Sequence, residues 1–237
     1  MRVPFLFFNF VTQHTSIMLQ SSTLKFLKDL IKNNNKPWFD EHRKQYDAAK
    51  EDFLLLVGKL INGIATFDTA IGSLEAKNCT FRINRDVRFS KNKVPYKSNL
   101  AAYFNKDGKK GIGAGYYLHV EPGKTFAAGG IWMPEPTILA NIRQEIDYNF
   151  TDWKKIIENK NFRNTFAQGV NSSDTLMRPP KGYDTNNQAI EFIKMKSFIV
   201  SRPFTDTDVQ NKSFVKEVAK TFGAMKPLID FLNTSVH

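Results

Sequence analysis

The sequence predicts an α+β fold, with an antiparallel sheet from about residues 79–133 packed by N-terminal and C-terminal helices. Two observations indicate this class. Apolar residues recur with a period near 3.6 before residue 66 and again after residue 136, whereas between them they alternate with a period of two, punctuated by Gly and Pro. Helices, then a block of strands, then helices again is the order of an α+β protein and not of alternating βαβ units.

Two helices are expected in the N-terminal part. Leu24, Leu27 and Leu30 share one stripe of a helix over 22–33, with Ser21 or Ser22 as the N-cap. Pro37 suits the first turn of a second helix. This helix is expected to run to about residue 65, because the apolar residues between 38 and 64 keep the helical period.

Four strands are expected next, near 79–89, 99–105, 113–121 and 124–133. Asp107-Gly108 and Pro122-Gly123 are typical of hairpin turns. Pro136 then opens a helix, further helices are expected near 150–158, 159–168 and 186–196, and a final long helix follows the capping signal Asp206-Thr207-Asp208. Residues 171–184 are expected to be irregular.

The composition is that of an ordinary globular protein. The chain has 237 residues, of which 41% are hydrophobic and 24% charged, so a disordered, collagen-like or coiled-coil chain is excluded. We expect one α+β domain over 18–237. Residues 1–17 are expected to be an N-terminal extension, because a second methionine, Met18, lies just before a plausible helix start. An apolar strand and a signal peptide are the alternatives for this segment.

Several chemistries are excluded by residue counts. The single cysteine, Cys79, excludes a disulfide framework and a multi-cysteine metal site. The four histidines never fall at the spacing of a zinc helix or finger. No stretch approaches the roughly 20 apolar residues of a membrane helix. We therefore expect a cytoplasmic protein with no metal, no cofactor and no membrane partner.

Positive charge is concentrated in one segment. The formal net charge is +11, and residues 77–110 alone carry ten Lys or Arg against Asp86 and Asp107. Such a concentration favours an anionic partner. Solvated lysines in turns are the simpler interpretation of part of it.

The candidate site lies on the predicted sheet. If 79–89 is a strand, Arg82, Asp86 and Arg88 share its polar face, while on 116–121 Tyr117 and His119 share a face with Glu121. Arginines can bind an anion bidentately and a histidine can move a proton. The alternative is a solvated sheet surface with ordinary cross-strand pairs.

Two other motifs are weaker indications of function. The run Gly111-Ile-Gly-Ala-Gly115 precedes a strand, whereas phosphate-binding glycines follow a strand and open a helix. It is better explained as the entry to a hairpin. Cys79 has no Cys or His neighbour in sequence that would make it a nucleophile.

Four blocks of sequence resemble one known family. They are the run 81–97 (FRINRDVRFSKNKVPYK), 117–122 (YLHVEP), 129–134 (GGIWMP) with Leu139, Ile142 and Arg143 beyond it, and 178–184 (RPPKGYD) with 194–198. Over about residues 20–232 the chain is similar to Domain of Unknown Function family 2461. After Asp184 the family often has an Asp-His-Pro element, where this chain has Asn186-Asn187-Gln188. The resemblance implies no activity, cofactor or catalytic residue.

The blocks indicate which side chains share a cleft. The candidate catalytic residues are His119 and Asp86, and the candidate ligand-binding residues are Arg82, Arg88, Tyr96, Lys97, Tyr117, Trp132, Arg143 and Lys181. The leading hypothesis is a cationic cleft on the sheet that binds a small phosphate- or carboxylate-bearing ligand, with enzymatic activity left open. The alternative is a nucleic-acid-binding protein that uses the basic segment 77–110 with its tyrosines. A structural or interaction protein with an incidental basic face is a third hypothesis.

Overall fold

The computed structural model describes residues 18–236, and the expected extension 1–17 lies outside them. The N-terminal helices are α1 (Ser21–Lys32), α2 (Lys36–Glu41), α3 (Arg43–Ala65) and α4 (Ala76–Cys79). The strands are β1 (Leu100–Phe104), β2 (Gly115–Val120), β3 (Thr125–Ile131) and β4 (Phe198–Phe204). Between β3 and β4 lie α5 (Pro136–Tyr148), α6 (Phe150–Ile157), α7 (Lys160–Thr165) and α8 (Ile190–Ile193), and α9 (Asp206–Val209) and α10 (Phe214–Asn233) follow β4.

The α+β class is confirmed. The four strands are hydrogen-bonded in the order β1-β2-β3-β4, and every neighbouring pair is antiparallel. The turns predicted at Asp107-Gly108 and Pro122-Gly123 connect β1 to β2 and β2 to β3. Gly108 and Gly123 have φ near +70°, which glycine adopts without a steric penalty.

The strand predicted over 79–89 is wrong. The segment touches the sheet through Thr80 opposite Ala102 and then leaves it. It folds back on itself instead, since Arg85 N–H donates to the Pro95 carbonyl and Lys97 N–H donates to the Ile83 carbonyl. The side chains that alternate with the predicted polar face do not form a buried apolar face, because Phe89 is 95% exposed.

The fourth strand is β4, at residues where the sequence predicted none. Pro203 lies inside it, and a proline has no N–H for a ladder. β4 is an edge strand, where proline is tolerated. The long helix predicted from Pro37 to about 65 also differs, because it is divided at His42 into α2 and α3.

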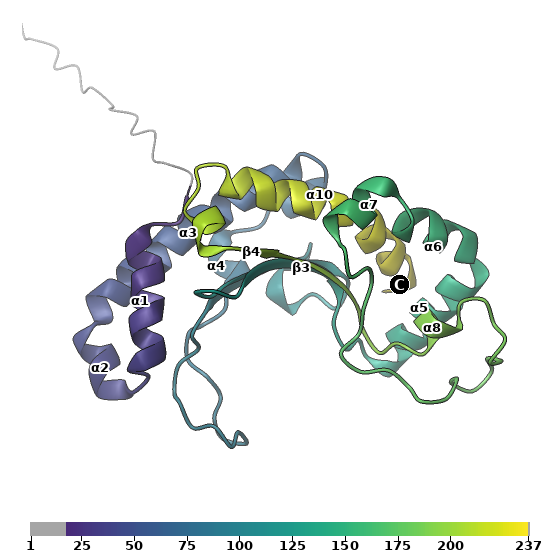
Figure 1. The fold of residues 1–237 in the computed structure, drawn as a ribbon, viewed down its shortest axis with the longest axis horizontal. Helices are drawn as coiled ribbons and strands as arrows, with labels where there is room; N and C mark the ends of the chain where they lie inside the picture. Colours follow the sequence, from purple (N-terminus) through teal and green to yellow (C-terminus); the bar gives the residue numbers. More distant parts are fainter. Residues whose placement is uncertain (1–17, 237) are drawn as a thin grey trace, which may run out of the picture.

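The two faces of the sheet have different surroundings. Tyr116, Leu118 and Val120 of β2 are fully buried, as the alternation predicted. They lie on the face covered by α10 and α3, where the ring of Tyr116 packs against Phe222 at 5.2 Å between centroids. Figure 1 shows these helices above the sheet, with the sheet curving beneath them like an arch.

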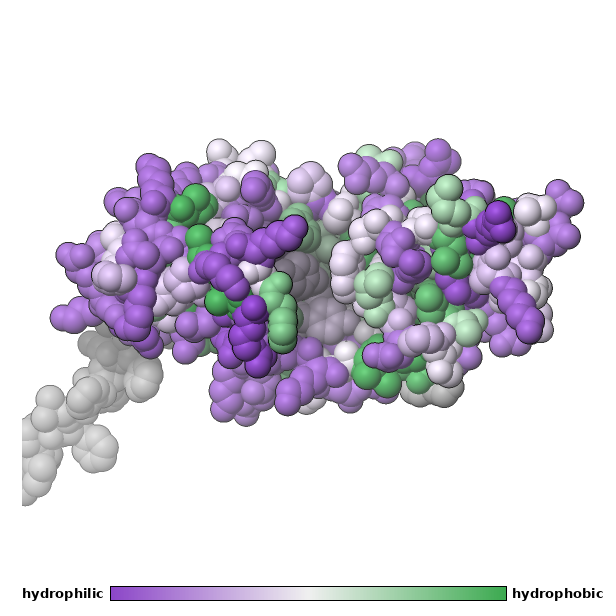
Figure 2. All heavy atoms as spheres, turned by 90° about the horizontal axis from the view of Figure 1, so that it is seen from below, coloured by the Kyte–Doolittle hydropathy of each residue, from purple (hydrophilic) through white to green (hydrophobic). Residues whose placement is uncertain are grey.

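The lower face of the arch is open and flanked on both sides. In Figure 1, α1, α2 and the 81–97 segment descend on one side, and α5, α8 and the segment before α8 descend on the other. Figure 2 looks directly at this face and shows a hollow between the two halves. The fold therefore leaves one sheet face as the floor of a cleft.

Candidate functional site

The cleft contains a cavity of about 530 Å³ on the open face of the sheet. Its floor comes from side chains that alternate with the buried face, so the pleat of the sheet alone aims them into the cleft. Its lining is mainly aromatic and aliphatic, and includes Phe81, Tyr103, Tyr117, Phe126, Trp132 and Ile199. This size and character are typical of a pocket for a small molecule.

Glycines give the cavity its depth. Gly115 and Gly130 lie opposite each other on β2 and β3 and both line the cavity. A Cβ at Gly115 would lie 2.8 Å from the Tyr103 ring, and a Cβ at Gly130 would lie 1.9 Å from the Phe198 carbonyl oxygen. Larger residues are therefore excluded at both positions, and the floor is bare backbone there.

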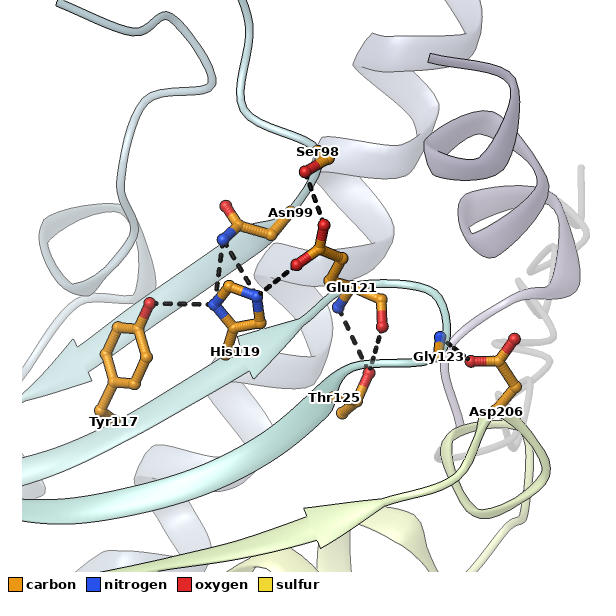
Figure 3. A network of polar contacts seen from close by, with 8 residues as sticks. All are labelled: Ser98, Asn99, Tyr117, His119, Glu121, Gly123, Thr125 and Asp206. Carbon is orange, nitrogen blue, oxygen red and sulfur yellow. Dashed lines mark hydrogen bonds and ion pairs between the residues drawn. The ribbon is translucent and has the colours of Figure 1, made fainter. Parts of the chain in front are cut away.

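A hydrogen-bonded chain runs beside the cavity from Ser98 to Tyr117 (Figure 3). The Ser98 hydroxyl donates to one oxygen of Glu121 at 2.6 Å, and the other oxygen lies 3.1 Å from His119 Nε2. On the far side of the imidazole, the Tyr117 hydroxyl lies 3.2 Å from Nδ1. Because a carboxylate only accepts, Nε2 carries a hydrogen and Nδ1 is free to accept from Tyr117.

Two neighbours hold the imidazole ring by its faces. The amide nitrogen of Asn99 is 2.9 Å from Nδ1 and 3.1 Å from Nε2, so it lies over the ring and not along either in-plane lone pair. Phe126 stacks on the ring, with the two centroids 4.8 Å apart and the two planes 14° apart. His119 is thus fixed in position and orientation, with its side chain only 12% exposed.

The electrostatics of this chain favour an ionised Glu121 and a protonated Tyr117. Burial opposes ionisation of Glu121, but hydrogen bonds from Ser98 and His119 outweigh it and lower the pKa of the carboxyl. Burial raises the pKa of the Tyr117 phenol, and the charge of Glu121 raises it further. Tyr117 lines the cavity, so the chain ends at a residue of the cavity wall.

Two cations, Lys97 and Arg82, lie close to each other beside Phe81, which lines the cavity. Lys97 Nζ is 5.4 Å from the centroid of Phe81, a ring that lines the cavity and also meets Tyr117 edge to face. Burial lowers the pKa of Lys97, and the nearby charge of Arg82 lowers it further. Neither cation has a carboxylate partner among residues 18–236.

Asp86 and Arg88 do not join this group. They form an exposed ion pair with each other, 2.6 Å from Arg88 Nη2 to Asp86 Oδ2, on the segment that leaves the sheet. We predicted Asp86 and Arg88 beside His119 because a strand at 79–89 would place them on one polar face. That strand does not form.

The other candidate residues are spread over the molecule. Trp132 lines the cavity and is 65% exposed. Tyr96 is buried, with its ring stacked on Phe39 at 3.9 Å, so it belongs to the core. Arg143 lies in α5, where one guanidinium nitrogen donates to the Met195 carbonyl at 3.1 Å and burial lowers its pKa. Lys181 is exposed in the segment before α8.

Sequence reasoning missed Ser98, Asn99 and Phe126. Ser98 and Asn99 precede β1 and carry no periodic signal of their own. The strand register places Ala101 of β1 and Phe126 of β3 directly opposite His119. The same register brings Ser98 and Asn99, just before β1, close to the imidazole and to Glu121. An alternating pattern within one strand cannot indicate which residue of the next strand lies beside it.

Metal and thiol chemistry have no support in the described part of the chain. No group of three or more His, Cys, Asp or Glu side chains in residues 18–236 is arranged to hold a metal ion. Cys79 is fully buried, and burial raises the pKa of its thiol to about 11. The thiolate, which is the reactive form, is therefore disfavoured at neutral pH.

Comparison with known proteins gives a family and no relative of known function. The model of a family described as conserved hypothetical protein (DUF2461) matches residues 22–231. No curated protein and no solved structure matches the chain. Within residues 18–236, no helix is both long enough and apolar enough to cross a membrane.

Proposed function

The chain belongs to the DUF2461 family of conserved hypothetical proteins, and we propose that it binds a small organic anion in the cleft beneath the sheet. The apolar part of the ligand lies on the aromatic floor. Its carboxylate or phosphate lies at the end of the cleft that Lys97, Arg82 and the Tyr117 hydroxyl share.

The observation that carries this proposal is a pair of cations, neither of which forms a direct ion pair with a carboxylate within residues 18–236, although the Asp86 carboxylate interacts with Arg82 at longer range. Lys97 is partly buried, and the nearby charge of Arg82 disfavours the charged form of Lys97 further. Placing two like charges together and removing one of them from water costs free energy. A bound anion would offset that cost at both residues, because charge-assisted hydrogen bonds to carboxylate or phosphate are strong.

The shape of the cavity supports an aromatic or otherwise flat ligand. Tyr103, Tyr117 and Phe126 present rings along the floor, and the bare backbone at Gly115 and Gly130 leaves room between them. Aromatic rings contribute favourably through offset stacking and edge-to-face contacts. Only an anionic group at one end is then needed to orient the ligand.

The test uses 1-naphthoate, a flat aromatic carboxylate, titrated into the protein while the tryptophan fluorescence is followed, to which Trp132 at the cavity contributes together with Trp38 and Trp153. We expect saturable binding. Lys97→Met and Arg82→Met should each weaken it by about tenfold or more, since a hydrogen bond to a charged group contributes roughly 1.5–3 kcal/mol.

Arg88→Met is the matched control, because Arg88 is an exposed arginine on the same segment but is paired with Asp86. It should leave the affinity for 1-naphthoate within twofold. Absence of binding, or an equal loss in Arg88→Met and Arg82→Met, would contradict the proposal.

A nucleic acid is the second candidate ligand, and one observation favours it. Phe89 is 95% exposed with the Arg88 guanidinium 5.8 Å from its ring centroid, and Lys91 and Lys93 are exposed beside it. An exposed aromatic among cations is suited to stacking with a single-stranded base. Titration with an oligothymidylate at two salt concentrations separates the two functions. Binding that falls steeply with salt and is lost in Phe89→Ser would favour the nucleic acid.

A further inference from the structure

We propose that the cleft is an acid–base site as well as a binding site: an anion bound there takes the hydrogen bond of Tyr117, and His119 takes up a proton that is poised for transfer to the ligand. This inference rests on the proposed function. It follows from how the hydrogens must be arranged along the chain from Glu121 to Tyr117.

In the free protein the hydrogens have one consistent arrangement. Glu121 accepts from Nε2–H of His119, so Nδ1 carries a lone pair, and the Tyr117 hydroxyl donates to it. The imidazole is neutral in this arrangement. The His119 side chain is only 12% exposed, so water has little access to either nitrogen.

A bound anion changes that arrangement. Tyr117 is the member of the chain that lines the cavity, whereas His119 lies behind it. When the phenol hydrogen turns to an anionic oxygen, the lone pairs of the phenol oxygen face the lone pair of Nδ1 across 3.2 Å. That repulsion is removed if Nδ1 binds a proton, because the imidazolium then donates to the phenol oxygen.

Lys97 and Arg82, at the Tyr117 end of the chain, oppose a cationic His119 until a bound anion neutralises them, and the remaining nearby charges then favour it. Glu121 lies 3.1 Å from Nε2 and its own pKa is lowered, so it is ionised and stabilises an imidazolium. Lys124 lies close enough to Glu121 to act on that carboxyl. From β1 and β3 the neighbours of His119 are Ala101 and Phe126, which carry no charge.

The proton on His119 lies two hydrogen bonds from the ligand. In a transfer step, the O–H bond of Tyr117 breaks and an O–H bond forms on the ligand, while the Nδ1–H bond of His119 breaks and restores the phenol. The imidazolium becomes neutral and the ligand anion gains one proton, so charge and atoms balance. Tyr117 is the catalytic residue here because it touches the ligand, and His119 and Glu121 are positioning residues that act through it.

The test measures proton uptake when 1-naphthoate binds. Calorimetric titration in two buffers of different ionisation enthalpy gives the number of protons taken up. For the wild type we expect an uptake approaching about one proton per ligand where free imidazole is neutral, near pH 7.5. We also expect the affinity to fall by up to about tenfold per pH unit as the pH rises, because binding is coupled to the uptake of a proton from solvent.

Two variants separate the relay from other sources of pH dependence. Tyr117→Phe keeps the ring but removes the hydroxyl, and His119→Gln removes the proton acceptor. In both, the uptake should fall close to zero and the affinity should become nearly independent of pH, with weaker binding at pH 6. Circular dichroism and thermal unfolding establish that each variant is folded. A pH dependence that came from Lys97 would persist in both variants.

Three outcomes decide the matter. Binding without proton uptake, or an uptake unchanged in Tyr117→Phe, overturns this inference and leaves the binding proposal standing. Absence of 1-naphthoate binding at every pH overturns both. Uptake that disappears in Tyr117→Phe and His119→Gln supports the relay.

Discussion

At the scale of single residues, a side chain's effect depends on whether its polar atoms have partners. The indole of Trp153 in α6 is fully buried and packs against Phe192, Phe198 and Phe231. Its Nε1–H has no hydrogen-bond partner among the described residues. An unpaired buried donor costs about 1–3 kcal/mol, which opposes the gain from burying the ring.

Two replacements of Trp153 should therefore differ strongly in their effect on stability. Trp153→Phe removes the unpaired N–H along with part of the ring, and the two effects offset each other, so we expect a loss of stability below about 1.5 kcal/mol. Trp153→Ala leaves a cavity among three phenylalanines and should cost about 3–5 kcal/mol. Chemical denaturation of both variants checks this. Equal losses would contradict it.

The residues of the site were predictable only in part. Alternation along β2 correctly placed Tyr117, His119 and Glu121 on the face opposite the core. It could not supply Ser98 or Asn99, whose contact with that face depends on the pairing of β1 with β2. Arg88 was misplaced for the same reason, because its predicted neighbours depended on a strand pairing that a single sequence does not determine.

At the scale of elements, two segments show where local pattern and tertiary structure differ. The alternation over 81–89 is typical of a strand, but five Lys or Arg between 82 and 93 are better solvated on a projecting segment than beside the core. Residues 198–204 contain Pro203, which argues against a strand in sequence. Position at the edge of the sheet removes that objection, and only the fold reveals it.

The pairing of β3 with β4 depends on one glycine. Gly130 has φ of +120° and its Cβ would lie 1.9 Å from the Phe198 carbonyl oxygen, which is backbone and cannot turn aside. Gly130→Ala should destabilise the protein by at least about 3 kcal/mol and weaken 1-naphthoate binding in the cavity that Gly130 lines.

Gly129→Ala is the matched control. Its Cβ would meet the sulfur of Met225 at 2.5 Å, at the end of a flexible side chain on the opposite face of the sheet. Met225 can adjust, so a smaller loss of about 1–2 kcal/mol is expected. Urea denaturation of the two variants compares them. A larger loss of stability in Gly129→Ala than in Gly130→Ala would show that the contact with the Phe198 carbonyl is not the reason why position 130 requires glycine.

At the scale of the whole molecule, the cleft exists because segments far apart in sequence are joined around the sheet. Asn34, between α1 and α2, donates to the Tyr96 carbonyl at 2.9 Å and accepts from its N–H at 3.1 Å. This attaches the end of the 81–97 segment, and with it Lys97, to the N-terminal helices. The cationic end of the cleft is therefore positioned by contacts between residues about sixty positions apart, which no local pattern reveals.

Asp206 makes a second connection of this kind. Its carboxylate accepts from Gly123 N–H in the β2–β3 turn at 2.8 Å and pairs with Lys28 of α1 at 2.9 Å (Figure 3 shows the first contact). The hydrogen bond from Gly123, and then that from Lys28, lower the pKa of Asp206 below its ordinary value of 3.8. One carboxylate thus joins α9, α1 and the turn that follows β2 and Glu121.

The sign of the pH dependence follows from that lowered pKa. A carboxyl with a lower pKa in the folded than in the unfolded state stabilises the fold above the unfolded pKa, and this contribution disappears as the pH falls through the folded one. Asp206→Asn should therefore lower the free energy of unfolding by about 1 kcal/mol at pH 7 and at pH 5. The difference from the wild type should shrink below about pH 4.

Asp40→Asn is the control, because Asp40 pairs with Lys36 within one exposed helical turn and should change stability by less than about 0.5 kcal/mol. If the Asp206→Asn difference were the same at pH 3 as at pH 7, the ionised carboxylate would not be what joins the three elements.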